Sequence, residues 1–543
     1  MPGVTDTMRC IQAPIRGGVN CRSTIYTRRV ARSSAIGLTG DDLTVPDVWA
    51  VAVERGPAEL SDTAREKMRA ARELVERAAH GSQEHTYGVN TGFGRFVNRS
   101  IPEELTQELQ LRLLRSHACG VGEPYADEIV RAAMLLRANT LAKGFSGARI
   151  PTVEQLVECL NRGVLPFVPA RGSVGASGDL APLAHLALPL IGEGHATVDG
   201  ELVEGSDALR AVGLEPVRLG SKEGLSLVNG TQFMTSMASL GLVRARRLAK
   251  TADLACALSL ESLQGSRTSF LAAVHSARPL RGQQESAANV WRLLDGSAII
   301  ESHRWCDKVQ DAYALRCAPQ VHGASRDLLD YVEATVAVEL NAATDNPLVL
   351  VDEELIVSAG NFHGQPLAFG LDALAMAVAE LANISERRVE RLVNPALSDG
   401  LPPFLVEEGG LNSGFMIPQY VAAALVSENK VLAHPASVDS IPTSAGQEDH
   451  VSMGNAAGLK ALRVLDNVER GLAIELLAGT QAIEFLAPLQ PGDGVRAVHD
   501  AVRALSPRLT EDRSLSADIE RVADAVRSGA IVAAAEAQVG ALA

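Results

Sequence analysis

The amino-acid sequence predicts a mainly α-helical protein, built as one large subunit around a bundle of long helices. Three stretches carry few residues that break helices: Thr231 to Gln264 has no proline and one glycine, Leu371 to Asn394 has neither, and Asn455 to Leu486 has no proline. All three are rich in Ala, Leu and Val, and aromatic residues make up only 4% of the chain. Small side chains let long helices approach closely, so these observations favour a helical bundle.

The segment from Leu371 to Asn394 has the clearest boundary. Pro395 follows it directly, and a proline disfavours helical backbone in the residue before it. A helix of this length spans roughly 36 Å. Long Ala-rich helices that cannot bury every face within one chain also favour association into oligomers.

The chain has 543 residues and shows no internal repeat and no low-complexity linker. We therefore expect residues 38–543 to form one subunit, with a mixed head region over 38–230 and the long helices over 231–543. Residues 1–37 carry six arginines and one acidic residue. We expect this extension to be disordered; a transit peptide, or translation that starts at Met8, are the alternatives.

Charge and cysteine usage limit the class of protein. The formal net charge is −15, which argues against broad nucleic-acid binding. The seven scattered cysteines predict free thiols in a reducing compartment, so we expect a cytoplasmic protein. No CxxC or HExxH motif occurs, so we expect no metal site. No uninterrupted apolar run reaches the roughly 18 residues of a membrane span.

The stretch RGSVGASGDL, from Arg171 to Leu180, crowds small residues where a turn normally needs one or two. Its tripeptide Ala176, Ser177 and Gly178 can cyclise when the amide nitrogen of Gly178 attacks the carbonyl carbon of Ala176. Loss of water closes a five-membered ring, and loss of the Ser177 hydroxyl leaves an exocyclic methylene. The product is the electrophile 4-methylidene-imidazol-5-one (MIO). Glycine suits the strained backbone, and Asp179 is placed to cap the helix that follows.

Ala-Ser-Gly alone is a weak motif, and an ordinary strand-to-helix turn is the simpler interpretation. However, GASGDLAPLAHL resembles the prosthetic-group signature of the aromatic amino acid lyases, which include ammonia-lyases and aminomutases. Further blocks resemble the same family in the same order, over roughly residues 38–500: YGVNTGFG, NGT after KEGLSLV, VQDAYALRCAPQVHGA, ELNAATDNPL, GNFHGQP and SAGQEDHVSMG.

The resemblance implies a mainly helical homotetramer of the histidine and phenylalanine ammonia-lyase type, in which three subunits build each active site. It implies removal of ammonia from an α-amino acid by MIO formed from the chain itself, with no external cofactor and no catalytic metal. Two accounts stay open: the electrophile takes the substrate amine, or it attacks the substrate ring and acidifies the β-proton.

The resemblance also assigns roles to single residues. Tyr87 is the candidate base for the β-proton, and we expect a nearby positive or hydrogen-bonding environment to lower its pKa. Asn229 and Tyr313 resemble residues that hold the prosthetic group and stabilise developing negative charge. Without the resemblance, packing in a Gly-rich turn is the favoured interpretation of Tyr87, and the alternatives for Asn229 and Tyr313 are a turn asparagine and a half-buried core tyrosine.

Arg316 resembles the arginine that grips the substrate carboxylate, for which a planar, two-pronged donor is suited. Gln310 is expected to support the same polar cluster. Phe362 resembles a phenylalanine near the prosthetic group. A surface ion pair is the alternative for Arg316, and core packing is the alternative for Phe362.

Two positions bear on the substrate. Ser116 and His117 occupy the place where the family reads the substrate ring, and this pair occurs in histidine-acting members and in bacterial tyrosine aminomutases. Glu448 matches a glutamate of the histidine-acting members. A carboxylate can accept an imidazole N–H, whereas against a benzene ring it would be unpaired and costly. We therefore expect L-histidine to be converted into trans-urocanate and ammonia.

Gln365 departs from the glutamate common in bacterial histidine-acting members, and glutamine occurs there in tyrosine-acting relatives. A tyrosine or phenylalanine ammonia-lyase, or a 2,3-aminomutase, is therefore the alternative. A non-catalytic helical scaffold that keeps the fold is a more distant one.

Overall fold

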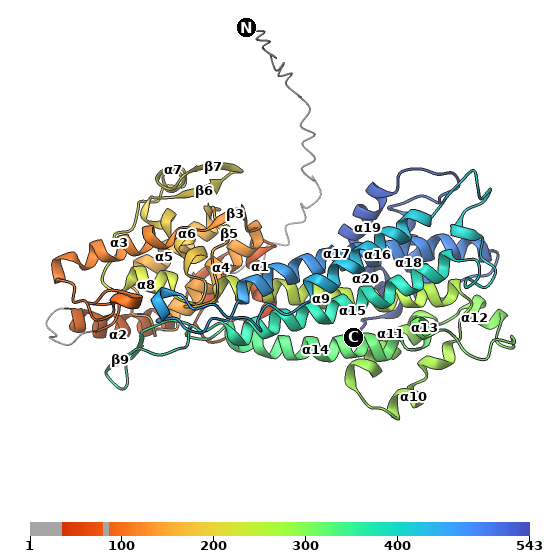
Figure 1. The fold of residues 1–543 in the computed structure, drawn as a ribbon, viewed down its shortest axis with the longest axis horizontal. Coiled ribbons are helices and arrows are strands. Elements are labelled where there is room, and N and C mark those ends of the chain that lie inside the picture. Colours follow the sequence, from red (N-terminus) through yellow and green to blue (C-terminus); the bar gives the residue numbers. More distant parts are fainter. Residues whose placement is uncertain (1–34, 80–85) are drawn as a thin grey trace, which may run out of the picture.

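Long helices dominate the computed structural model, which describes residues 35–79 and 86–543. The molecule is elongated, with a mixed region at one end and long parallel and antiparallel helices running to the other (Figure 1). The described part of the chain contains 20 α-helices and four small sheets. The predicted mainly α-helical bundle is confirmed.

The long helices match the predicted segments with small shifts. The stretch from Thr231 forms α9 (Gln232–Ser262), and the stretch from Asn455 forms α17 (Gly454–Ile483). The stretch from Leu371 forms α15 (Gln365–Val393), which begins six residues earlier than predicted. Pro366 is tolerated in its first turn, because the N–H groups there have no partner within the helix. It ends before Pro395, as predicted.

The bundle is completed by two helices for which the sequence analysis made no prediction. These are α14 (Ala318–Glu339) and α16 (Met416–Leu432). Helix α15 packs along α17, α9 and α14, and α16 packs on α15 and α17. The apolar faces meet in one continuous core that extends into the mixed region.

Helix α15 is long and apolar enough to cross a bilayer, and 72% of its most apolar stretch is buried within the protein. Such a mostly buried apolar stretch suits a helix at the centre of a large bundle. A buried ion pair between Arg388 of α15 and Glu475 of α17 ties the two helices together.

The mixed region holds short helices and most of the strands. Helix α1 begins with a capping box in which Thr44 and Asp47 satisfy each other's backbone N–H groups. Helix α4 is buried on all sides from Ile129 to Ala142. The helices are α1 (Val45–Ala52), α2 (Asp62–Ala79), α3 (Thr106–His117), α4 (Asp127–Ala142), α5 (Ile150–Asn161), α6 (Leu180–Ala187), α7 (Gly205–Ala211) and α8 (Glu223–Val228).

The sheets are small. Strand β1 pairs in parallel with β2, β3 with β5 in antiparallel, β6 with β4 and β7 in antiparallel, and β8 with β9 in antiparallel. The strands are β1 (Ile36–Leu38), β2 (Ala58–Leu60), β3 (Val121–Pro124), β4 (Leu165–Pro166), β5 (Pro169–Arg171), β6 (His195–Val198), β7 (Glu201–Glu204), β8 (Leu348–Leu350) and β9 (Leu355–Val357).

Strand β1 includes the last two residues of the predicted N-terminal extension, Ile36 and Gly37. Residues 1–34 of that extension lie outside the described residues, so the prediction of disorder for them stays a prediction. The same holds for Cys10 and Cys21, while the five cysteines that the structure describes are unpaired.

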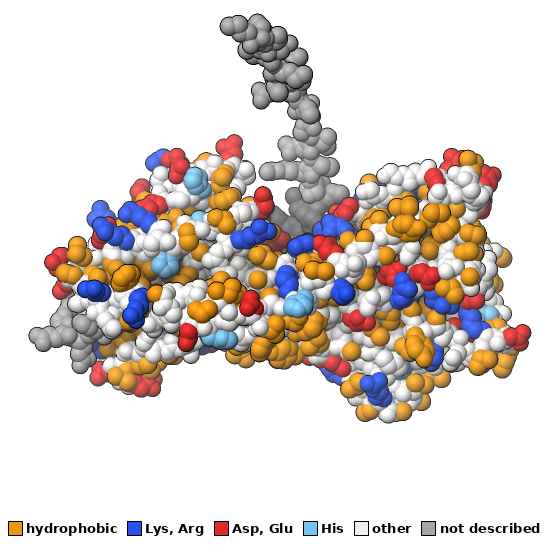
Figure 2. Space-filling model, in the orientation of Figure 1, with side chains coloured by type: hydrophobic (Ala, Val, Ile, Leu, Met, Phe, Trp, Pro, Cys, Tyr) orange, Lys and Arg blue, Asp and Glu red, His pale blue; other side chains and the backbone are white. Residues whose placement is uncertain are grey.

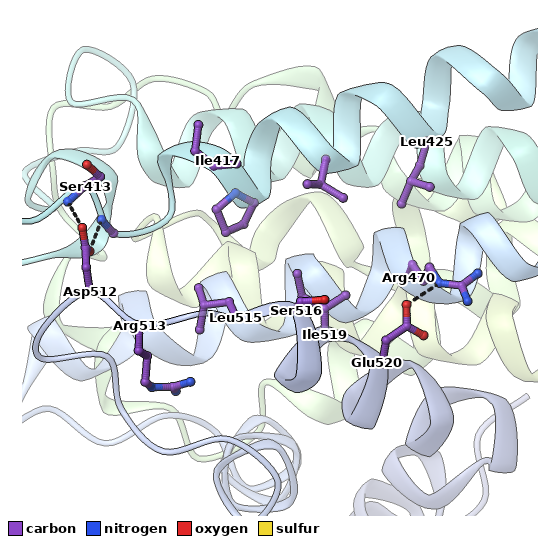
Figure 3. A pocket seen from close by; sticks show the side chains of 13 residues that line it. Ser413, Ile417, Leu425, Arg470, Asp512, Arg513, Leu515, Ser516, Ile519 and Glu520 are labelled. Carbon is purple, nitrogen blue, oxygen red and sulfur yellow. Dashed lines mark hydrogen bonds and ion pairs between the residues drawn. The ribbon is translucent and has the colours of Figure 1, made fainter. Parts of the chain in front are cut away.

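Shorter helices close the opposite end of the bundle. They are α10 (Ala272–Ser276), α11 (Arg281–Leu293), α12 (Ala298–Ser302), α13 (Tyr313–Arg316), α18 (Asp493–Arg503), α19 (Ser516–Ser528) and α20 (Ala530–Val539). Between α16 and α19 a mainly apolar groove of about 630 Å³ remains open. Figure 3 shows Ile417 and Leu425 on one side of it and Leu515 and Ile519 on the other, with the Arg470–Glu520 ion pair at one end.

Candidate active site

A cleft of about 800 Å³ opens in the mixed region. Six residues singled out from the sequence line it together, although they come from five separate segments of the chain. These residues are Tyr87, Ser116, His117, Ser177, Asn229 and Glu448.

The tripeptide 176–178 lies in the turn between strand β5 and helix α6. The Ser173 hydroxyl spans this turn, because it donates to the carbonyl oxygen of Gly178 at 3.2 Å and accepts from the amide of Gly175 at 3.1 Å. Gly178 has a φ of +75°, and a Cβ there would collide with the carbonyl oxygen of Gly230. Both the left-handed backbone and this close approach require glycine at position 178.

The Asn229–Gly230 turn packs directly on the tripeptide. The amide of Asp179 donates to the Gly230 carbonyl at 2.7 Å, and the amide of Gly230 donates to the Ser177 carbonyl at 3.3 Å. The Asn229 side-chain amide nitrogen donates to the carbonyl of Asn346 at 2.9 Å. Its side-chain oxygen is buried and has no hydrogen-bond partner among the described residues.

Asp179 occupies the N-cap position of α6, but its carboxylate does not cap that helix. Instead it accepts hydrogen bonds from the amides of Phe233 (2.9 Å) and Met234 (3.0 Å), in the first turn of α9. The prediction that Asp179 caps the helix that follows it, α6, is therefore wrong. Its carboxylate caps α9 instead, a helix distant in sequence whose first turn offers free N–H groups. Burial raises the pKa of Asp179 to about 7, although these N–H groups oppose the rise.

Tyr87 lies edge-on to the ring of Phe93, at 6.2 Å between ring centroids. The amide of Gly94 is 3.5 Å from its hydroxyl. Burial raises the pKa of Tyr87, this N–H opposes the rise, and the carboxylates of Glu448 and Asp345 raise the pKa further. The expected lowering of the Tyr87 pKa is therefore wrong for the single chain, because burial raises the pKa and the charges that face the phenol are negative.

His117 is the last residue of α3, with Ser116 before it. Its Nδ1 lies 2.9 Å from the carbonyl oxygen of Leu113. A carbonyl can only accept, so Nδ1 carries the proton and Nε2 is left as an acceptor. Burial lowers the pKa of His117, which keeps the imidazole neutral. His117 is thus a helix-terminal residue in the cleft rather than a loop residue.

Glu448 belongs to a tight turn, where Ser444 and Ala445 both have left-handed backbone, with φ of 51° and 53°. The Thr443 hydroxyl donates to the Glu448 carboxylate at 2.7 Å. A Cβ on Gly94 would meet the Ser444 hydroxyl at 2.5 Å. The segments that carry Tyr87 and Glu448 therefore lie against each other.

Three predicted site residues lie at the other end of the bundle. Arg316 donates to the carbonyl of Asp311 at 2.9 Å, and its guanidinium stacks at 4.6 Å over the ring of Tyr313, which is 70% exposed. Gln310 is also exposed and lies at this end. Helix α9 has 31 residues, roughly 46 Å, and separates this end from Asn229. Within one chain these three residues cannot reach the cleft.

Phe362 is half-buried two residues before Gly364, where a Cβ would meet the Met234 sulfur at 2.8 Å. It therefore lies at the same end as the tripeptide, but it does not line the cleft. Gln365 is the first residue of α15, and its side chain reaches the carbonyl of Ser437 at 3.4 Å.

Several cleft residues were not predicted. Asn346 lies in the block ELNAATDNPL, which was singled out only as a whole. Arg95 and Arg99 follow the Tyr87 block on an exposed segment at the cleft's rim. A position inside a recognised block, for Asn346, or directly after one, for Arg95 and Arg99, is the signal that could have identified them.

Comparison with known proteins places the chain among well-defined relatives. The profile of the family described as aromatic amino acid lyase matches residues 43–504. A histidine ammonia-lyase of Gloeobacter violaceus is 56% identical over 505 residues, covering 93% of this chain and 98% of its own. The crystal structure of histidine ammonia-lyase from Trypanosoma cruzi has a TM-score of 0.86 at 45% identity, covering 93% of this chain and 95% of that one. A tyrosine aminomutase from Streptomyces globisporus has a TM-score of 0.89 at 39% identity, covering 94% of this chain and 100% of that one.

Proposed function

The chain belongs to the aromatic amino acid lyase family, and from this premise we propose that it converts L-histidine into trans-urocanate and ammonia. It is a carbon–nitrogen lyase. The choice of substrate rests on one observation: the cleft that holds Ser177 is lined by two hydrogen-bond acceptors, the Glu448 carboxylate and the Nε2 atom of His117.

The tripeptide and its surroundings fit the MIO group. Glycine at 178 allows the close backbone approach that a ring needs, and Ser177 faces the cleft. The Asn229–Gly230 turn bonds to the tripeptide, and the Asn229 side-chain amide keeps a second N–H beyond the one that the Asn346 carbonyl accepts, a donor that suits the acceptor atoms of the ring. When formed, MIO supplies an electrophile that the twenty ordinary side chains lack.

Each remaining residue then has a defined task. Tyr87 accepts the β-proton once it is ionised. Asn229 holds its amide toward the site of developing charge, anchored through its bond to the Asn346 carbonyl. Glu448, held by Thr443, and His117 accept the two N–H groups of an imidazolium ring. A phenol offers a single donor and a phenyl ring offers none, so one or both acceptors would stay unpaired.

Arg316, Tyr313 and Gln310 complete the site from other subunits of a homotetramer. The length of α9 separates them from the cleft of their own chain; Tyr313 and Gln310 are exposed, and Arg316 is half-buried beside Tyr313. Hydrophobic side chains gather over the helical part of the surface, near α16 and along α14 (Figure 2). They include Ile417, Tyr420, Val421, Tyr331 and Val338. Such faces suit contact with further copies of the chain.

In this proposal Phe362 lies near the prosthetic group. The proposed compartment is the cytoplasm.

The experiment that tests the function follows near-ultraviolet absorbance with L-histidine, L-tyrosine and L-phenylalanine in parallel, for the wild type and for Ser177→Ala. Urocanate from histidine alone, lost in Ser177→Ala, supports the proposal. Coumarate or cinnamate with free ammonia would identify another ammonia-lyase, and a β-amino acid would identify an aminomutase. The absence of product with all three amino acids would contradict the proposal.

A further inference from the structure

Arg137 is a fully buried arginine of helix α4 that lies behind the Asn229–Gly230 turn. Its Nη1 donates to the carbonyl oxygen of Asn229 at 2.6 Å and to the Gln232 side chain at 3.0 Å. Its Nε and Nη2 are buried and have no partner within residues 35–79 and 86–543. Burying a guanidinium with unused donors costs free energy, so the presence of Arg137 behind this turn needs an explanation.

The turn is enclosed on both sides. A Cβ on Gly230 would lie 2.6 Å from Nη1 of Arg137 and 2.5 Å from the carbonyl oxygen of Thr344. On its other side, the Gly230 carbonyl accepts from the amide of Asp179 at 2.7 Å and would collide with a Cβ on Gly178. Direct contacts therefore run from Arg137 through the turn to the tripeptide.

The charge of Arg137 is not neutralised nearby. The carboxylate that acts on it, Asp345, already forms a buried ion pair with Lys222 at 2.9 Å. Burial lowers the pKa of Arg137 to about 10, which still leaves it protonated at neutral pH. Arg137 is therefore a buried cation behind the turn with no carboxylate bonded to it among the described residues.

Helix α4 provides its own comparison. Arg131, on the same helix, is also buried, and burial lowers its pKa to about 10 as well. All three of its nitrogens donate to backbone carbonyls, those of Val51, Ala52 and Leu160. Arg131 thus joins helices as a structural residue does, whereas Arg137 bonds to the turn that touches the tripeptide.

We propose that Arg137 is a positioning residue for the self-processing of the chain. It clamps the Asn229–Gly230 turn so that the Gly230 carbonyl presses the 177–179 backbone into the conformation in which ring closure occurs. A bond then forms between the Gly178 nitrogen and the Ala176 carbonyl carbon. One water leaves with the Ala176 oxygen and the amide hydrogens of Ser177 and Gly178; a second leaves with the Ser177 hydroxyl and its α-hydrogen. The inference rests on the proposed function.

The test is the intact mass of purified, full-length protein, which gives the fraction of chains that have lost two water masses. Arg137→Met is compared with Arg131→Met, and Arg137→Lys tests rescue by a side chain that keeps the charge and one donor toward Asn229. We expect Arg131→Met to lower the thermal midpoint while its ring-bearing fraction matches the wild type. We expect Arg137→Met to lose the ring at least tenfold while it remains helical by circular dichroism, and Arg137→Lys to recover part of it.

Gly230→Ala provides an independent variant if Arg137→Met does not fold. Its added Cβ displaces the turn while Arg137 remains, so the ring-bearing fraction should fall as well. Ring formation at the wild-type fraction in a folded Arg137→Met or Gly230→Ala would overturn the inference. A wild-type chain without the ring would instead overturn the MIO proposal itself, and the inference with it.

Discussion

The carboxylate of Asp179 lies 2.9 Å from the amide nitrogen of Phe233, so the residue that follows the tripeptide caps a helix more than fifty positions further along the chain. Through this bond the turn that carries Ser177 is fixed to the N-terminus of α9, one of the long helices of the bundle. The positive end of that helix also favours a negative group at this point.

The same carboxylate makes stability depend on pH. Burial raises the folded-state pKa of Asp179 to about 7, above its ordinary value near 4. The folded state therefore binds this proton more tightly, and its contribution to stability is full below about pH 4 and is lost as the pH rises through about 7. Asp179→Asn keeps acceptors for both amides without the charge. We expect its thermal midpoint to fall less than that of the wild type between pH 5 and pH 8, at equal protein concentration. An identical pH dependence in the two proteins would contradict this.

Glu448→Gln tests the choice of substrate. Loss of a charged acceptor costs about 1.5–3 kcal/mol, so we expect kcat/KM for L-histidine to fall roughly 10- to 100-fold. Thr443→Val keeps the carboxylate and removes only the hydroxyl that holds it, so its loss should be smaller. Steady-state kinetics with histidine and tyrosine on all three proteins measure both effects. Unchanged histidine kinetics in Glu448→Gln would show that the carboxylate does not read the ring.

Tyr87→Phe tests the proposed base. We expect kcat to fall by about 10²- to 10⁴-fold, the usual contribution of a general base, with KM changed far less. Because burial raises the pKa of Tyr87 above its ordinary value, the phenolate is a minor species near pH 7, and wild-type kcat should keep rising with pH above neutrality. Residual activity of Tyr87→Phe should lack this rise. The pH profiles of kcat for both proteins measure it, and parallel profiles would exclude Tyr87 as the titrating group.

The sequence predicted the long helices well because their boundaries depend on local signals. Pro395 ends α15 through the backbone of its neighbour, and proline-free, Ala-rich stretches carry the same preference along their length. Motifs recognised in the sequence also singled out six of the residues that line the cleft. These motifs hold positions that the fold brings together from distant segments, as it does for His117 and Glu448.

Tertiary contacts that leave no local pattern could not be predicted. Asp179 follows a turn and precedes a helix, so the local pattern favours the nearer N-terminus, yet the carboxylate bonds to α9. The surroundings of Tyr87 are set by Glu448 and Asp345, which lie more than two hundred positions away in sequence. Arg137 is one charged residue among many in the sequence, and only its burial and its bond to the Asn229 carbonyl distinguish it.

The buried ion pair between Arg388 and Glu475 should make the central bundle sensitive to the loss of either partner alone. Both side chains are fully buried, and Arg388 also donates to the carbonyl of Ala314 in α13 at 3.3 Å. Glu475→Leu leaves a buried guanidinium unpaired, which costs about 3–5 kcal/mol. The double variant Arg388→Met with Glu475→Leu removes both charges and should recover much of this loss. Thermal unfolding of the wild type, single and double variants measures it. A double variant less stable than Glu475→Leu would contradict the expectation.

Subunit mixing tests whether Arg316 acts in a site whose tripeptide comes from another chain. Ser177→Ala lacks the electrophile and Arg316→Ala lacks the carboxylate grip, so each protein alone should be nearly inactive. Co-expressed with different tags and purified as mixed assemblies, some sites receive an intact Ser177 from one chain and an intact Arg316 from its neighbour. Random mixing of equal amounts should restore about a quarter of the wild-type sites. If both residues served a site from one chain, no mixed assembly could contain a complete site. A shared site is expected because α9 alone, roughly 46 Å long, separates the two residues within one chain. Mixed tetramers identified by native mass that form no urocanate would therefore contradict it.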